Sequence, residues 1–268
     1  MNNLLVRAIT GSLFVGAVIG AILWNPWAAA ILFGAFMALG VYEFTRLING
    51  HSGNRTQQFF AIFVSLLVYI AATAVITGQL PPDALFLAFP LLTVSFLLSL
   101  SSRSETVVQN VALTWFAILY VLVPFTMIVH LCFVSDNAWD LIGMLVLIWT
   151  NDTFAYASGK TFGKTMLFER ISPKKTWEGT IGGVFFTLIA GFCWSLWMSE
   201  LPLDFWMIVA PLVALGAIFG DLFESQIKRQ LGVKDSGNIL PGHGGILDRF
   251  DAAFMAIPIF YGLWMIYN

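Results

Sequence analysis

The sequence predicts an all-α integral membrane protein with about nine transmembrane helices. Of its 268 residues, 59% are hydrophobic and only 10% are charged, and the mean hydropathy is +0.84. A soluble domain carries roughly a quarter charged residues. Apolar runs recur along the whole chain, so we expect one membrane domain over 1–268. Within it, we expect 1–135 to act as a scaffold or in dimer contacts, and 140–268 to carry the chemistry.

Each predicted span is a run of about 20 apolar residues, which is the length that crosses a bilayer core. The first run is longer than the apolar region of a secretory signal, and a second follows at once, so we expect an uncleaved first helix. Pro124 lies inside one run, which leaves either one kinked helix or a helix with a re-entrant piece. The predicted spans are 8–24, 27–44, 59–78, 84–101, 111–134, 140–158, 177–198, 204–224 and 250–267.

The basic residues are segregated between the connections. All 13 lysines and arginines precede the first span or follow the second, fourth, sixth or eighth. Because positively charged loops face the cytoplasm, we predict a cytoplasmic N-terminus and a C-terminus outside. The net charge of −2 gives no indication of a nucleic-acid partner. The opposite connections carry acids and no base: Asp83, Asp136, Asp140, Glu200 and Asp204.

An acid lies inside the sixth predicted span. Asp152 is about two helical turns from Lys160. An aspartate at such a depth costs roughly 2.5–3.5 kcal/mol to insert, so it requires a partner, water or an ion. A hydrogen bond to a neighbouring helix is the structural alternative. We favour a functional site, because intramembrane acids usually mark one.

Four polar residues share one face at the cytoplasmic end of the eighth span. Asp221, Glu224, Ser225 and Lys228 have helical spacings of three, four and seven from the first. A Glu224–Lys228 ion pair is the simple explanation for two of them, and it leaves Asp221 deeper in the helix.

A second pair of acids begins the ninth span. Asp248 and Asp251 are three residues apart, and the helix dipole alone favours acids at that position. Asp221 and Asp248 together are nevertheless typical of a Mg²⁺ site, because this ion takes one or two carboxylates and completes its shell with phosphate and water.

The connection between these acids has the composition of an anion site. Gly244 and Gly245 allow backbone N–H groups to approach a phosphate closely. His243 is a candidate for phosphate binding or proton transfer, although a solvated loop histidine is the ordinary alternative. Together with three bases, these residues favour triphosphate binding. The bases are Lys228, Arg229 and Lys234.

Two lysines mark the other long cytoplasmic connection. Lys174 and Lys175 precede a predicted helix start, where the helix dipole disfavours cations. Lysines at a membrane surface most often meet lipid headgroups. A bound substrate phosphate would offset the dipole penalty, and we favour that role.

These residues resemble a known signature. The sequence is similar to that of the phosphatidate cytidylyltransferases, also called CDP-diacylglycerol synthases, mainly over 150–251. The resemblance rests on Asp152-Thr153-x-Ala155-Tyr156, Ile171-Ser172-Pro173-Lys174-Lys175-Thr176-x-Glu178-Gly179, Ser225-x-Ile227-Lys228-Arg229, Lys234-Asp235-x-Gly237 and Leu240-Pro241-x-His243-Gly244-Gly245-Ile246-x-Asp248-Arg249-Phe250-Asp251.

The resemblance implies a reaction in which CTP and phosphatidate give CDP-diacylglycerol and pyrophosphate. It also implies Mg²⁺ held by Asp221 and Asp248, an additional monovalent cation such as K⁺, a homodimer, and a bacterial inner membrane with the site at its cytoplasmic face. The candidate catalytic residues are Asp221, Asp248, Lys228, Arg229 and His243. The candidate substrate-binding residues are Asp152, Lys174, Lys175, Thr176, Ser225, Lys234, Asp235, Gly244, Gly245, Arg249 and Asp251.

Two other functions compete with this hypothesis. A secondary transporter would use Asp152 and Asp221 along an ion path, but transporters usually place such groups near the midplane of broken, repeat-related helices. Here the polar groups lie towards the cytoplasmic edge. Another CTP-using membrane lipid enzyme, such as a polyprenol kinase, would not be expected to keep the full signature.

Overall fold

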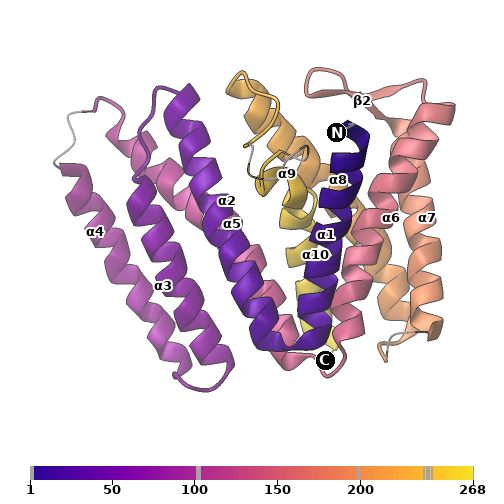
Figure 1. The fold of residues 1–268 in the computed structure, drawn as a ribbon, viewed down its shortest axis with the longest axis horizontal. Coiled ribbons are helices and arrows are strands. Elements are labelled where there is room, and N and C mark those ends of the chain that lie inside the picture. The colour runs from indigo at the N-terminus through magenta and orange to yellow at the C-terminus, as the bar shows by residue number, and fades with distance from the viewer. Residues whose placement is uncertain are drawn as a thin grey trace. The chain divides into compact units, whose positions relative to one another are not determined.

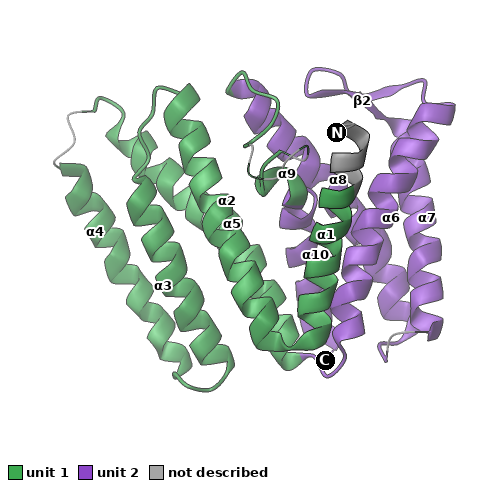
Figure 2. Cartoon of the chain, viewed as in Figure 1, with its two compact units in different colours: residues 1–134, 231–249 green, residues 135–230, 250–268 purple. Residues whose placement is uncertain are grey.

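The computed structural model describes residues 3–100, 104–197, 200–237, 239, 242 and 244–267, and most of these are helical (Figure 1). The chain forms two compact units (Figure 2). Unit 1 consists of residues 1–134 and 231–249, and unit 2 of residues 135–230 and 250–268. The segment 231–249, which we call the signature loop, therefore belongs to the same unit as the amino-terminal helices.

Unit 1 is built around α2, which packs against α3 and α5. Its core is apolar: Phe33, Met37 and Phe125 are fully buried, and the Phe33 and Phe125 rings lie 6.0 Å apart. Asn25 caps α2 by accepting a hydrogen bond from the Trp27 amide at 2.8 Å. The helices of this unit are α1 (Asn3–Trp24), α2 (Pro26–His51), α3 (Gln58–Ile76), the 3-10 helix η1 (Pro82–Leu87), α4 (Ala88–Leu100) and α5 (Val107–Val134).

Unit 2 packs α7 against both α6 and α8, and α10 against α8. Small residues permit these close approaches. A Cβ atom added at Gly183 of α7 would lie 2.6 Å from Asn151 Oδ1 of α6. The unit contains α6 (Ala138–Phe162), β1 (Met166–Phe168), β2 (Ser172–Thr176), α7 (Trp177–Trp197), α8 (Leu203–Gln230) and α10 (Ala253–Tyr267), and the short α9 (Leu247–Phe250) runs from the signature loop into it.

Six helical segments among the described residues are long and apolar enough to cross a bilayer. The chain therefore has the composition and helix lengths of an integral membrane protein. The number of nine membrane-crossing helices, and the side on which each terminus lies, remain predictions. The six segments are Pro26–His51, Gln58–Ile76, Pro82–Leu100, Val107–Val134, Trp177–Trp197 and Leu203–Gln230.

The structure differs from the predicted elements at three places. The connection 159–179 contains an antiparallel hairpin of β1 and β2. In this hairpin, Met166 pairs with Thr176, and Phe168 pairs with Ser172. Strands of three and five residues are too short to show an alternating pattern. The predicted span 84–101 begins as a 3-10 helix, η1, and becomes α-helical only at Ala88.

The predicted helix 250–267 is interrupted between α9 and α10. Its two linking residues pack on α8: a Cβ atom at Gly220 would lie 2.5 Å from the Asp251 carbonyl oxygen and 3.0 Å from that of Ala252. By contrast, α5 runs without interruption through Pro124, so this segment is one helix and not a helix with a re-entrant piece.

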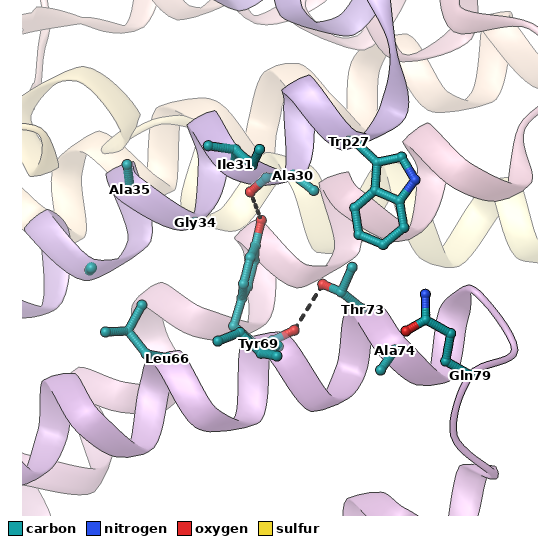
Figure 3. Close-up of a pocket in the computed structure, with 12 residues that line it drawn as sticks. Trp27, Ala30, Ile31, Gly34, Ala35, Leu66, Tyr69, Thr73, Ala74 and Gln79 are labelled. Carbon is teal, nitrogen blue, oxygen red and sulfur yellow. Dashed lines mark hydrogen bonds between the residues drawn. The ribbon is translucent and has the colours of Figure 1, made fainter.

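An apolar groove of about 370 Å³ lies between α2 and α3 in unit 1 (Figure 3). Tyr69 crosses it and donates a hydrogen bond to the Ala30 carbonyl at 2.7 Å. Gly34 leaves room for this ring, because a Cβ atom there would lie 2.8 Å from it. The groove offers few polar groups, so the candidate chemistry has to be sought at the charged connections.

Candidate functional site

Asp221 is anchored on α8 by two partners. Lys175 of β2 places its Nζ 2.7 Å from Asp221 Oδ2 and also lies 3.4 Å from the Ile218 carbonyl. One turn further along α8, the Ser225 hydroxyl donates to Asp221 Oδ1 at 3.1 Å. The Lys175 and Asp221 side chains are 25% and 33% exposed. The hairpin thus brings one of the two predicted lysines to the predicted metal ligand.

A buried ion pair lies one turn from Asp221. Lys228 Nζ is 3.2 Å from Glu224 Oε1, and the two side chains are only 10% and 4% exposed. Two charges removed from water in this way require each other, because an uncompensated buried charge is costly. The pairing considered from the sequence is therefore formed. Contact between Lys228 and a triphosphate remains a prediction.

Two further predicted acids belong to the same cluster in unit 2. Asp251 lies within electrostatic range of Asp221, Glu224 and Lys228, because the backbone at Asp251 and Ala252 rests against Gly220. Asp152 is exposed on α6 and lies within range of Asp221 and Lys175. Unit 2 therefore gathers four carboxyl groups and two ammonium groups, and a bound cation would stabilise the ionised form of such a cluster of acids.

The signature loop in unit 1 holds Asp248 through neutral donors. Asp248 Oδ2 accepts hydrogen bonds from the Ser236 amide and hydroxyl, both at 2.9 Å, and from the Gly245 amide at 2.8 Å. Of the two predicted glycine amides, that of Gly245 is therefore directed to the loop's own carboxylate. A role for Gly244 and Gly245 in binding a substrate phosphate remains a prediction.

A carboxylate that the sequence reasoning did not select lies beside Asp248. Glu43 of α2 is 3% exposed, and its Oε2 accepts a hydrogen bond from the Leu247 amide at 3.0 Å. Like Asp152, Glu43 is an acid inside a predicted apolar span, 27–44, so the same sequence signal indicates it. It lies far from the long charged connections that carry the other candidate residues.

A polar cavity of about 660 Å³ lies between the end of α2 and the signature loop. Arg46 and His51 line it from the helix, and Asp235 and Ser236 line it from the loop. Arg46 lies over the Tyr42 ring, 5.9 Å from its centroid. Asp235, a predicted substrate-binding residue, thus lines the same cavity as Arg46 and His51 of α2. Nothing in the sequence indicated that these side chains would lie near Asp235.

Two polar residues stabilise the start of α7. Thr176 caps the helix, and its Oγ1 accepts a hydrogen bond from the Gly179 amide at 3.1 Å. Beside it, Glu178 accepts hydrogen bonds from the Lys164 and Thr165 amides at 3.1 and 3.2 Å.

The other candidate residues are a histidine and four bases. His243 lies outside the described residues. The exposed bases of the predicted site are Lys174, Arg229, Lys234 and Arg249.

The carboxylates fit a hard cation completed by substrate. Among the described residues, no three His, Cys, Asp or Glu side chains converge closely enough to enclose a metal ion by themselves. Mg²⁺ is usually held by one or two carboxylates together with substrate phosphate and water, so such an enclosure is not required. Asp221 and Asp248 lie in different units, and their joint use for one ion remains a prediction.

Comparison with known proteins adds independent findings. The Cytidylyltransferase family profile matches residues 5–267. A phosphatidate cytidylyltransferase of Thermotoga maritima is 33% identical over 97% of this chain and 96% of its own length. One of Haemophilus influenzae is 29% identical over 95% and 96%. One of Staphylococcus aureus strain COL is 43% identical over 47% of this chain and 48% of its own length.

Proposed function

We propose that this chain, which belongs to the cytidylyltransferase family, transfers the cytidylyl group of CTP to phosphatidate and releases pyrophosphate. The observation that carries the proposal is the match of the family profile over residues 5–267, together with relatives of this name aligned over nearly the whole chain. It favours this enzyme over the transporter and the polyprenol kinase. The product is CDP-diacylglycerol, a precursor for phospholipid synthesis.

The reaction needs positioning and charge compensation more than proton transfer. A phosphatidate phosphate oxygen attacks the α-phosphorus of CTP, and the bond from that phosphorus to the bridging oxygen of the leaving pyrophosphate breaks. The attacking phosphate monoester is already ionised near neutral pH, so no strong general base is required. The protein's contribution is then to hold two polyanions close together and in line.

Residues of the chain divide these tasks in our proposal. Lys175 orients Asp221 through its 2.7 Å contact, and Ser236 and Gly245 orient Asp248. The exposed bases and the loop around His243 bind the phosphates of CTP and phosphatidate. Asp221 and Asp248 would hold Mg²⁺, which when bound neutralises charge on the reacting phosphates. A monovalent cation such as K⁺ is proposed as a second cofactor.

The location follows from the same proposal. Six helical segments suited to a bilayer among the described residues, and bacterial relatives, support an integral membrane protein. We propose the bacterial inner membrane, with the charged connections at the cytoplasmic face where CTP is available, and a homodimer as the functional state. Phosphatidate would enter sideways from the lipid.

An activity assay tests the function. Purified full-length protein in detergent, given CTP, phosphatidate and Mg²⁺, is expected to form CDP-diacylglycerol and pyrophosphate in equal amounts, measured by mass spectrometry and a pyrophosphate assay. An inactive wild-type protein would contradict the function. Asp248→Asn and Asp221→Asn are expected to lose at least about 100-fold in kcat, since each removes a charged ligand. Full activity of either variant would contradict the metal assignment.

A further inference from the structure

We propose that Glu43 is a positioning residue: it anchors the signature loop to α2 and thereby sets the position of Asp248. The inference rests on the proposed function, because it assigns a role relative to a proposed metal ligand. Nothing in the signature itself points to α2. The juxtaposition is a product of the fold, since Glu43 and its partner Leu247 are 204 residues apart in the chain.

The burial of Glu43 is the first observation. It is a carboxylate near the end of the apolar part of α2, shortly before the polar residues Thr45 and Arg46, and only 3% of its surface is exposed. A buried charge is costly unless it is hydrogen-bonded or paired. A carboxylate buried at that cost needs a compensating contact, and the contact that compensates it indicates its role.

The compensating contact is with the signature loop. Glu43 Oε2 accepts the Leu247 amide at 3.0 Å, at the first residue of α9 and directly before Asp248. The Ile246 amide and the Ser236 hydroxyl face the same carboxylate. The other oxygen, Oε1, is buried and accepts no hydrogen bond of good geometry from the described residues. The hydrogen bond from Leu247 to Oε2 is therefore the best-defined anchoring contact.

The loop is shaped to admit this side chain. A Cβ atom at Gly237 would lie 2.7 Å from Glu43 Oε1, and one at Gly245 would lie 2.5 and 2.6 Å from Oε2 and Oε1. Real Cβ atoms do not approach other atoms so closely, so glycine at both positions lets the loop close around the carboxylate. The two halves of the loop meet at Glu43.

The same loop residues hold Asp248. Ser236 and Gly245, which face Glu43, donate the three hydrogen bonds to Asp248 Oδ2. Glu43 is fixed by a 26-residue helix, whereas the described residues of the signature loop before α9 form neither a helix nor an extended strand. Asp248 therefore takes its position from α2 through Glu43. Small displacements at such a site cost rate, because the reacting groups need close alignment.

Three substitutions separate anchoring from charge. Glu43→Gln keeps the length and one acceptor oxygen for the Leu247 amide. Glu43→Asp keeps the charge but is shorter by one methylene, so it does not reach that amide. Glu43→Ala removes both. We expect kcat of the Glu43→Gln variant to stay within about threefold of wild type. For the Glu43→Asp and Glu43→Ala variants we expect kcat to fall about tenfold or more. A hydrogen bond worth about 1.4 kcal/mol in the transition state corresponds to a tenfold change in rate.

Two readouts distinguish positioning from general destabilisation. The Mg²⁺ concentration for half-maximal activity should rise about tenfold in the Asp and Ala variants, with a small change in KM for phosphatidate. Hydrogen exchange, measured without substrate or metal, should accelerate in peptides covering 244–250 and stay unchanged in α8. Asp140→Asn, which alters another buried acid at the start of α6, is the control for losing a buried carboxylate.

The outcomes are separable from a failure of the proposed function. Wild-type protein that makes no CDP-diacylglycerol contradicts the function, while the exchange measurement still tests the anchor. Higher activity in Glu43→Asp than in Glu43→Gln would overturn the proposal in favour of a role for the charge. Unchanged kcat and unchanged loop exchange in Glu43→Ala would also overturn it. If the Ala variant is not recovered folded, the comparison of Asp with Gln decides.

Discussion

Asp221 and Asp248 are held in different ways. In unit 2, Asp221 contacts the ammonium group of Lys175 as well as the Ser225 hydroxyl, and the neighbouring Glu224 contacts the ammonium group of Lys228. In unit 1, Asp248 is held by the amides of Ser236 and Gly245 and by a serine hydroxyl. One set of carboxylates is positioned by charge, and the other by the shape of a loop.

The difference predicts two kinds of sensitivity. Lysine partners neutralise a carboxylate and respond to changes of charge and salt. Neutral donors hold a carboxylate in place while leaving its negative charge, and they respond to changes in backbone geometry. Substitutions in unit 2 should therefore act through charge, and those in the signature loop should act through size.

The largest effect on stability is expected at the buried pair. Lys228→Met leaves Glu224 charged and buried without this partner, so we expect the free energy of unfolding to fall by about 3–5 kcal/mol. The double variant Glu224→Gln/Lys228→Met should recover most of the loss in a denaturant titration in detergent. A double variant that is stable yet inactive would support contact between Lys228 and the triphosphate. A double variant that regains activity would show that Lys228 serves only as the ion-pair partner of Glu224.

A smaller effect is expected from adding one methyl group to the signature loop. In Gly245→Ala the new Cβ would lie 2.4 Å from Ser236 Oγ as well as against Glu43, so we expect a loss of about 1–3 kcal/mol and a lower kcat. Gly20→Ala in α1 is the matched control, because a Cβ there has nothing within 4 Å. Equal thermal stability and activity in both variants would remove the size argument for unit 1.

Unit 2 also contains a neutral contact, at the start of α7. Thr176 caps α7 through the Gly179 amide, and loss of a helix cap costs about 1 kcal/mol. We expect Thr176→Ala to lower the unfolding free energy by about that amount, and Thr161→Ala, whose hydroxyl contacts a carbonyl of its own helix, to change it less. An equal loss in the two variants would show that the cap contributes nothing specific.

The smallest effect on stability is expected at the partly exposed pair. Lys175→Gln removes a lysine that is 25% exposed, so solvent screening should keep the change below about 1 kcal/mol. Lys174→Gln, at the exposed neighbour on the same strand, is the control for stability. Activity of Lys175→Gln should nevertheless fall, because Asp221 loses its orienting contact. A stability loss as large as that of Lys228→Met would show that solvent exposure does not determine how much the Lys175–Asp221 and Lys228–Glu224 pairs contribute to stability.

Much of the helical framework could be predicted from the sequence. Long apolar runs specify where helices lie, because a bilayer requires about 20 apolar residues for each crossing. The start of α7 at Trp177 was expected, and Asp221, Ser225 and Lys228 were expected on one face of α8. The hairpin and the break between α9 and α10 were not, because the first is too short for a pattern and the second depends on packing against Gly220.

The membrane class, the helix runs and the family signature could be predicted without coordinates, because they depend on composition and on residues close together in the chain. Which side chains meet became known from the folded arrangement. Lys175 reaches Asp221 because the hairpin folds towards α8, and Glu43 reaches Leu247 because the signature loop returns to α2. Such contacts join residues far apart in the chain, and helix periodicity carries no information about them.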